Sequence, residues 1–173
     1  MNIVLTGFMG TGKSAVGRKL AQRAGRDFYD TDQIIEKDAG MSVAEIFSRK
    51  GEYFFRQAES EAIKLVAMLD NLVVAVGGGA ALKEENMEEL KKNGRVVCLT
   101  ASPEVIWQRV EKNRNRPLLN KKDSQAEIKK LLAERASLYQ RCDFTVQTDN
   151  LNLDQIVEKI IALMPELKPV EGK

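Results

Sequence analysis

The segment GFMGTGKS, from Gly7 to Ser14, carries the residue types that bind a polyphosphate. It matches the pattern G-x-x-x-x-G-K-[ST] in full and lies between an apolar run and an amphipathic segment, as this motif requires. Its glycines let successive N–H groups turn toward phosphate oxygens. Lys13 adds a charge for the β- and γ-phosphates, and Ser14 offers a hydroxyl to Mg²⁺. The spacing does not fit the dinucleotide pattern G-x-G-x-x-G, which disfavours a nicotinamide-dependent oxidoreductase.

Two carboxylates, Asp30 and Asp32, stand one residue apart in the segment FYDTDQ. In extended backbone their side chains would project to the same side and repel each other. Mg²⁺ near Asp30 and an acceptor hydroxyl near Asp32 would relieve that repulsion, as in a kinase for a small molecule. The alternative is that Asp32 only caps the helix that follows. From the residues alone, both interpretations stay open.

A basic segment supplies cations for such a reaction. Between Arg109 and Lys122 there are six basic residues and one acid, Glu111, in a polar and irregular stretch. A solvated loop is the simpler interpretation, but in a P-loop protein we expect a lid that closes over ATP and excludes water. An arginine in such a lid would stabilise charge on the transferring phosphoryl group, an effect worth ~10³–10⁵ in rate.

Two further features are candidates for binding the acceptor molecule. Arg56 follows two phenylalanines in the segment GEYFFRQAE and would pair with a substrate carboxylate, or else with Glu52 or Glu59 in a surface salt bridge. The triple glycine Gly77–Gly79 follows an apolar run, and glycines at the end of a strand let a ligand approach backbone N–H groups closely. Alone, each is a weak signal.

The composition excludes several classes of protein. A chain of 173 residues is the size of one domain, and a net charge of +2 does not indicate a nucleic-acid or membrane partner. There is no histidine, which excludes catalytic triads that contain histidine and zinc sites with histidine ligands. The two cysteines are far apart in sequence, and the first residues do not form a signal peptide. We therefore expect reduced thiols and a cytoplasmic location.

The elements that position these residues follow from the apolar pattern. Continuously apolar runs at residues 2–6, 72–76, 95–100 and 143–148 predict strands of a parallel sheet covered on both faces. They alternate with helical segments at residues 13–24, 82–93 and 152–164 and from residue 102, which indicates a doubly wound α/β fold. Residues 42–69 are helical without an intervening strand; Ser42 and Glu45 form a capping box, and Gly51 divides the run into two helices.

Taken together, the motifs resemble those of the shikimate kinase family over nearly the whole chain. The matching segments are GFMGTGKSAVG, DTDQIIEKDAGMSVAEIF, GEYFFRQAE, VGGGA, RNRPLL and ERASLYQRCD. The resemblance implies a five-stranded parallel sheet like that of nucleoside-monophosphate kinases, in a single domain over residues 1–173. Substrate-binding helices would span about 31–69, and the lid about 112–124. It implies transfer of the γ-phosphoryl of ATP to the 3-hydroxyl of shikimate, in the route to chorismate and the aromatic amino acids.

The resemblance also implies a role for individual residues. Asp32 would hold the acceptor hydroxyl as its base or orienter, Lys13 and Arg116 would contact the phosphates, and Ser14 and Asp30 would serve Mg²⁺. The implied nucleotide-binding residues are Gly10, Thr11, Gly12, Lys13, Ser14, Ala15, Arg109 and Arg116. The implied substrate-binding residues are Asp32, Phe47, Phe55, Arg56, Gly78, Gly79 and Arg135. The protein would act as a monomer on ATP and shikimate, with no nucleic-acid or membrane partner.

Three other functions have specific features against them. A nucleoside-monophosphate or gluconate kinase is the nearest, but a nucleotide acceptor would need more arginines than Arg49 and Arg56 between residues 32 and 69. A nucleotide-binding switch would need the motif D-x-x-G, which the chain lacks, and its NKKD at residues 120–123 does not follow an apolar strand. A nucleic-acid-binding module would need aromatic residues among the basic ones.

Overall fold

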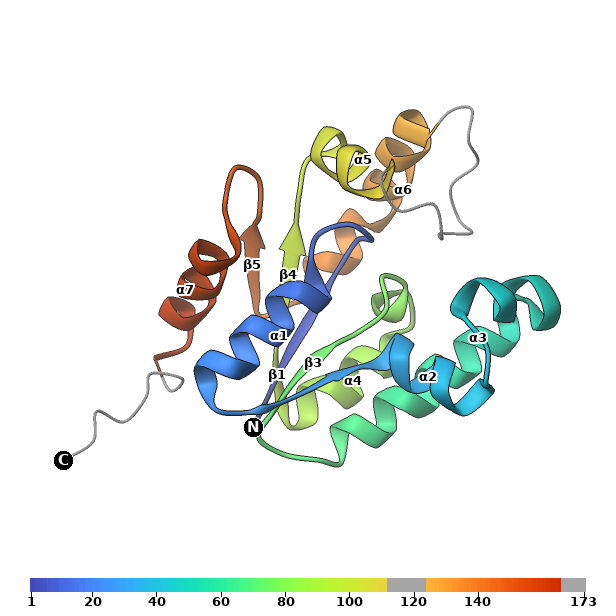
Figure 1. Ribbon diagram of the computed structural model, residues 1–173, viewed down its shortest axis with the longest axis horizontal. Coiled ribbons are helices and arrows are strands. Elements are labelled where there is room, and N and C mark those ends of the chain that lie inside the picture. The colour runs from blue at the N-terminus through green and yellow to red at the C-terminus, as the bar shows by residue number, and fades with distance from the viewer. Residues whose placement is uncertain (112–123, 166–173) are drawn as a thin grey trace.

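The computed structural model describes residues 1–111 and 124–165 and contains a five-stranded parallel sheet with helices on both faces (Figure 1). The strands are β1 (Asn2–Gly7), β2 (Asp27–Asp30), β3 (Leu72–Ala75), β4 (Gly94–Thr100) and β5 (Phe144–Gln147), in the order β2-β3-β1-β4-β5. The predicted doubly wound α/β fold is therefore confirmed. The strand β2 has no long apolar run because it lies at an edge of the sheet, where its residues are partly exposed.

The helices lie close to their predicted positions. They are α1 (Lys13–Ala24), α2 (Thr31–Ala39), α3 (Val43–Ala67), α4 (Glu84–Lys92), α5 (Pro103–Glu111), α6 (Ser124–Tyr139) and α7 (Leu153–Leu163), with a short 3₁₀ turn, η1 (Ala80–Leu82). The predicted helix over residues 82–93 begins two residues late because Lys83 has extended backbone (φ −103°, ψ 122°). Within the described part of the chain, no helix has an apolar stretch long enough to cross a membrane.

The predicted capping box and break in the long helix are both present. Ser42 and Glu45 satisfy each other's backbone N–H groups at the start of α3. Gly51 has φ 83° and ψ 169°, values outside the helical region, and so kinks α3 one-third of the way along. The part of α3 after this kink carries Arg56 toward the sheet.

The core has two layers because each central strand buries both of its faces. On β1, Ile3 and Leu5 pack with α1 and α7, while Val4 faces the opposite side and packs with α3 and α4. All three side chains are at most 1% exposed. Burying one such side chain stabilises a fold by about 1.5–3 kcal/mol. Rigid strands packed in this way hold the ends of the sheet in fixed positions.

The strand order brings the chemical motifs to one edge of the sheet. The chain leaves β1 toward the β2 edge and leaves β3 toward the opposite edge, so a crevice is expected at the carboxyl ends of β1 and β3. The P-loop follows β1, the acidic pair ends β2 and begins α2, and the triple glycine follows β3. In a parallel sheet these carboxyl ends all lie on one side. The fold therefore gathers three segments that are far apart in sequence.

Candidate active site

The P-loop joins β1 to α1 and is held by hydrogen bonds from its own side chains to its backbone carbonyls. Gly12 caps α1 with φ 96°, a left-handed conformation that favours glycine, and no side chain caps this helix end. Thr11 Oγ1 donates to the Phe8 carbonyl at 2.8 Å, and Lys13 Nζ donates to the carbonyls of Gly7 at 2.9 Å and Phe8 at 3.1 Å. The predicted strand–loop–helix context is confirmed, and N–H groups at the start of a helix are donors suited to an anion.

Ser14 and Asp30 lie in contact beside this loop. Ser14 Oγ donates to Asp30 Oδ2 at 2.6 Å, although the two residues belong to different elements. A hydroxyl and a carboxylate are the hard oxygen ligands that Mg²⁺ prefers, and Mg²⁺ is usually bound through one or two carboxylates together with substrate phosphates. Across residues 1–111 and 124–165, no cluster of three or more acidic, cysteine or histidine side chains could hold a metal. The donors present therefore fit Mg²⁺ that is shared with a nucleotide.

The predicted geometry of the acidic pair is wrong. Asp30 ends β2 in extended backbone (φ −121°, ψ 117°), but α2 begins at the next residue, so Asp32 lies in the first helical turn. The two side chains therefore do not project from one extended strand. The residue that caps α2 is Asp30, whose Oδ1 accepts from the Asp32 N–H at 3.1 Å. Capping consequently does not account for Asp32.

Gly77 lies where three elements meet at the end of β3. Its N–H donates to Thr31 Oγ1 at 3.2 Å. A Cβ atom at position 77 would lie 2.5 Å from Glu59 Oε1 and 2.9 Å from Asp32 Oδ1. Carboxylates from α2 and α3 thus approach the same backbone position, and a side chain there would require both to shift.

We expect Gly77→Ala to destabilise the protein because a methyl group at this position must displace both carboxylates. Overpacking of this kind costs about 1–3 kcal/mol. The free energy of unfolding, measured by urea denaturation, should fall by that amount. An unchanged value would show that Glu59 and Asp32 move aside without cost.

Arg56 forms the ion pairs that the sequence left as an alternative. Its Nη1 lies 2.8 Å from Glu59 Oε2 and its Nη2 lies 3.1 Å from Glu52 Oε1. The pair with Glu52 lies at the surface, as the alternative predicted, but the pair with Glu59 does not, because Glu59 is only 1% exposed. The guanidinium also abuts the triple glycine, since a Cβ at Gly79 would lie 2.2 Å from Arg56 Nη1. From the sequence, Glu59 is only a possible surface partner of Arg56. The signal for their pairing is its position three residues after Arg56 on a helix.

The buried carboxyl of Glu59 should make stability depend on pH. Burial raises its pKa above the ordinary value of 4.5, and Arg56 opposes part of this shift. A raised pKa in the folded state means that the contribution of Glu59 to stability is complete below its ordinary pKa and is lost as pH rises through the folded-state pKa.

We therefore expect wild type to lose stability relative to Glu59→Gln as pH is raised from about 4 toward neutrality. Urea denaturation of both proteins at each pH gives this difference. Glu61→Gln, an exposed position on α3, controls for the loss of one carboxylate. If wild type instead gained stability relative to Glu59→Gln as pH rose, the ion pair with Arg56 would outweigh the cost of burying the charged carboxylate.

Helix α6 brings Arg135 and Tyr139 to the same glycine turn. Arg135 Nη1 and Tyr139 Oη both donate to the Gly78 carbonyl at 3.3 Å. The Arg135 guanidinium also lies 5.4 Å from the centroid of the Phe8 ring in the P-loop. Tyr139 was not among the predicted site residues. The signal that could have found it is its position four residues after Arg135, on the same face of a helix.

The remaining predicted residues are placed as follows. Arg109 on α5 donates to the carbonyl of Gly10 at 3.3 Å and to Thr148 Oγ1 at 3.1 Å, so it lies against the P-loop. The rings of Phe47 and Phe55 are 4.8 Å apart and come from α3, on either side of its kink at Gly51. Ala15 is exposed in the first turn of α1. Arg116 and the predicted lid lie outside the described residues.

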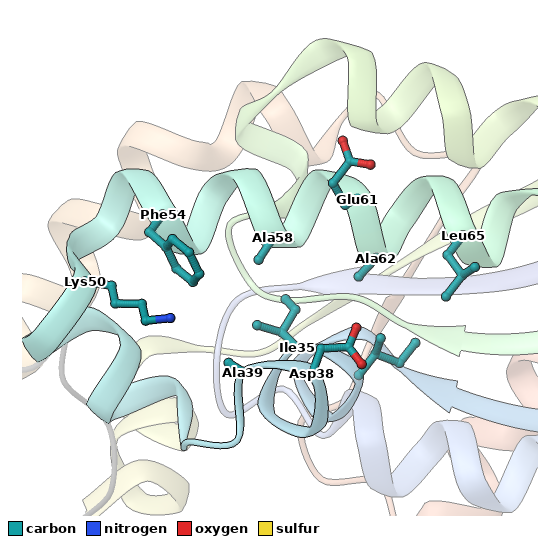
Figure 2. A pocket seen from close by; sticks show the side chains of 10 residues that line it. Ile35, Asp38, Ala39, Lys50, Phe54, Ala58, Glu61, Ala62 and Leu65 are labelled. Atoms are coloured by element: carbon teal, nitrogen blue, oxygen red, sulfur yellow. The ribbon is translucent and has the colours of Figure 1, made fainter.

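A cavity of about 460 Å³ lies between α2 and α3 and is separate from this site. Figure 2 shows Ile35, Phe54 and Leu65 around it, with the charged side chains of Lys50 and Glu61. None of the predicted site residues lines this cavity. The predicted site residues that the structure describes gather instead around the P-loop, the acidic pair and the glycine turn.

Comparison with known proteins gives one consistent family. Residues 9–165 match the family model described as shikimate kinase. The chain is 48% identical to a shikimate kinase of Thermodesulfovibrio yellowstonii, covering 92% of each protein, and 49% identical to one of Pelotomaculum thermopropionicum, covering 98% of this chain and 99% of that one. A solved structure of shikimate kinase from Acinetobacter baumannii in complex with shikimate superposes with a TM-score of 0.91 at 37% identity, covering 96% of this chain and 94% of that one.

Proposed function

The chain belongs to the shikimate kinase family, and we propose that its active site lies where the P-loop, the acidic pair and the glycine turn converge. The activity is that of an ATP-dependent kinase: the γ-phosphoryl group of ATP passes to the 3-hydroxyl of shikimate, giving shikimate 3-phosphate and ADP. The observation that carries the assignment is the meeting of a phosphate loop with a carboxylate and two arginines at one edge of the sheet.

The roles of the residues follow from their chemistry. The hydroxyl oxygen of shikimate attacks the γ-phosphorus, the bond to the bridging oxygen of ADP breaks, and the hydroxyl proton leaves toward the carboxylate of Asp32. Lys13 and the N–H groups at the start of α1 neutralise charge on the phosphates. Phosphoryl transfer depends mainly on positioning and charge, so the reaction does not require a histidine, which the chain lacks.

Two arginines suit the acid group of the acceptor. Arg56 and Arg135 reach the glycine turn from different helices, and a guanidinium binds a carboxylate through paired hydrogen bonds. The flanking glutamates hold Arg56 in the free protein, so shikimate would share this arginine with Glu59 rather than meet it unpaired. The phenylalanines Phe47 and Phe55, which pack together nearby, are proposed to form the apolar wall of the pocket.

Ser14 and Asp30 would hold Mg²⁺. The ion, when bound, neutralises phosphate charge and orients the γ-phosphoryl group. The protein's own contribution is to keep a hydroxyl and a carboxylate in contact at the start of α1, as the 2.6 Å hydrogen bond between them indicates. Arg109, which lies against the P-loop, is proposed to contact the adenine, and Arg116 to reach the phosphates.

The remaining assignments concern the whole chain and stay predictions. We propose one kinase domain over residues 1–173, with substrate-binding helices over about 31–69 and a lid over about 112–124. A cytoplasmic monomer without nucleic-acid partners is also proposed; the free state of both cysteines is compatible with a reducing compartment.

The test is a coupled assay of ADP release with Mg-ATP. Shikimate, gluconate and nucleoside monophosphates are offered as acceptors under the same conditions. Of these acceptors, we expect only shikimate to cause ADP release. We expect no release with shikimate when Mg²⁺ is removed with a chelator. Release of ADP with gluconate or a nucleotide but not with shikimate would overturn the assignment.

A further inference from the structure

We propose that Tyr139 is a positioning residue for acceptor binding: its hydroxyl orients the peptide unit between Gly78 and Gly79 so that the Gly79 N–H is presented to the carboxylate of the acceptor. The proposal rests on the proposed function and assigns a role to a residue on α6 that touches neither ATP nor the reacting atoms. Three observations support it, from the peptide unit, from its surroundings and from the tyrosine itself.

The peptide unit transmits orientation from one side to the other. The Gly78 carbonyl and the Gly79 N–H belong to one planar group and, in a trans peptide, point in opposite directions. No described peptide bond is cis. The hydrogen bonds from Tyr139 and Arg135 hold the carbonyl, and so they also set the direction of the N–H. Donation to the carbonyl further polarises the peptide unit and strengthens its N–H as a donor.

The surroundings of the Gly79 N–H suit an anion. Gly79 is buried, and within residues 1–111 and 124–165 its N–H donates no hydrogen bond. A buried N–H without a partner is rare in folded proteins and points to a ligand. The guanidinium of Arg56 lies against the same residue and supplies further donors. A carboxylate, which only accepts hydrogen bonds, is the group that satisfies both.

Tyr139 is suited to hold this arrangement rigidly. It is 8% exposed and belongs to the core cluster that also contains Cys98, and its hydroxyl contacts the Gly78 carbonyl across 61 residues of sequence. Burial raises the pKa of Tyr139 to about 12, so the hydroxyl keeps its proton and stays a donor at neutral pH. Gly78 lies close against the P-loop, since a Cβ there would be 3.3 Å from the Met9 N atom.

The experiment compares Tyr139→Phe with wild type in the ADP-release assay. Loss of one hydrogen bond to the turn should raise the KM for shikimate by about threefold to tenfold, while kcat and the KM for ATP stay within about twofold. With a neutral analogue, in which an amide replaces the carboxylate, the ratio of the two KM values should return to about one. If the role of Tyr139 were merely structural, Tyr139→Phe would change the KM values for shikimate and for the amide analogue by the same factor.

Matched variants and a second measurement keep the outcomes distinct. Tyr53→Phe, at a tyrosine that is 78% exposed, should behave as wild type. Amide NMR provides a readout independent of turnover: shikimate should shift the Gly79 N–H resonance in wild type, and this shift should shrink in Tyr139→Phe. Unchanged KM values and an unchanged Gly79 shift in a folded variant would overturn the role of Tyr139. Failure of wild type to use shikimate would instead overturn the proposed function.

Discussion

Replacement of Asp32 by asparagine should lower kcat by about 10²–10⁴-fold while nucleotide binding stays near its wild-type value. Asparagine keeps the size of the side chain but cannot accept the hydroxyl proton or stabilise a hydroxyl through a full negative charge. The cap of α2 is retained, because it is formed by Asp30. The helix should therefore stay folded, and the loss should appear in the chemical step.

Steady-state ADP release measures kcat for this variant, and isothermal titration calorimetry measures the affinity for Mg-ATP. Asp38→Asn, at an exposed position on the same helix, is the matched control and should keep full turnover. If Asp32→Asn also kept its turnover, Asp32 would have no part in the reaction. If the Asp32→Asn protein also lost affinity for Mg-ATP, the Asp32 carboxylate would instead help Asp30 to bind Mg²⁺.

Replacement of Lys13 by methionine should lower kcat/KM for ATP by about 10²–10³-fold, the loss expected when one charged donor to a developing charge is removed. In the structure the ammonium donates to the Gly7 and Phe8 carbonyls, which holds it within the loop that would receive the phosphates. Methionine fills a similar volume without the charge. The fold should persist, because the rest of the loop is held by Thr11 and by the backbone.

Circular dichroism and thermal melting verify that the Lys13→Met protein is folded before its rate is interpreted. Lys19→Met is the control on the same helix: it removes an ion pair with Asp154, with N and O atoms 3.0 Å apart, on the side of α1 that faces α7. That variant should retain the wild-type rate, since an exposed ion pair contributes only about 0–1 kcal/mol. A wild-type rate for Lys13→Met would refute the phosphate role.

Local signals were sufficient for most of the elements. Helix α1 has its predicted bounds, and the capping box at Ser42 and the break at Gly51 are where short-range rules place them. Such features depend on neighbours within about four residues, so one sequence can reveal them. The error at the acidic pair has a similarly short range: α2 begins at Thr31, two residues before the start implied by a cap at Asp32, and the residue that caps it is Asp30.

Contacts across the chain could not be predicted in this way. Glu59 appeared as a surface partner of Arg56, whereas packing of α3 on the sheet buries it against Gly77. Tyr139 and the Gly78 carbonyl are separated by 61 residues, and no local pattern links them. Whether a side chain reaches another element depends on how helices pack on the sheet, and that packing is decided by the whole core.

The sequence by itself determined the kind of chemistry: a phosphate loop, two carboxylates, no histidine, and the family to which these motifs point. Only the tertiary structure decided which residues share the site, because the carboxyl ends of β1, β2 and β3 and the face of α6 are brought together by strand order and helix packing. Residue types set what a group can do. The distances that decide whether it acts arise only when distant segments are buried against one another.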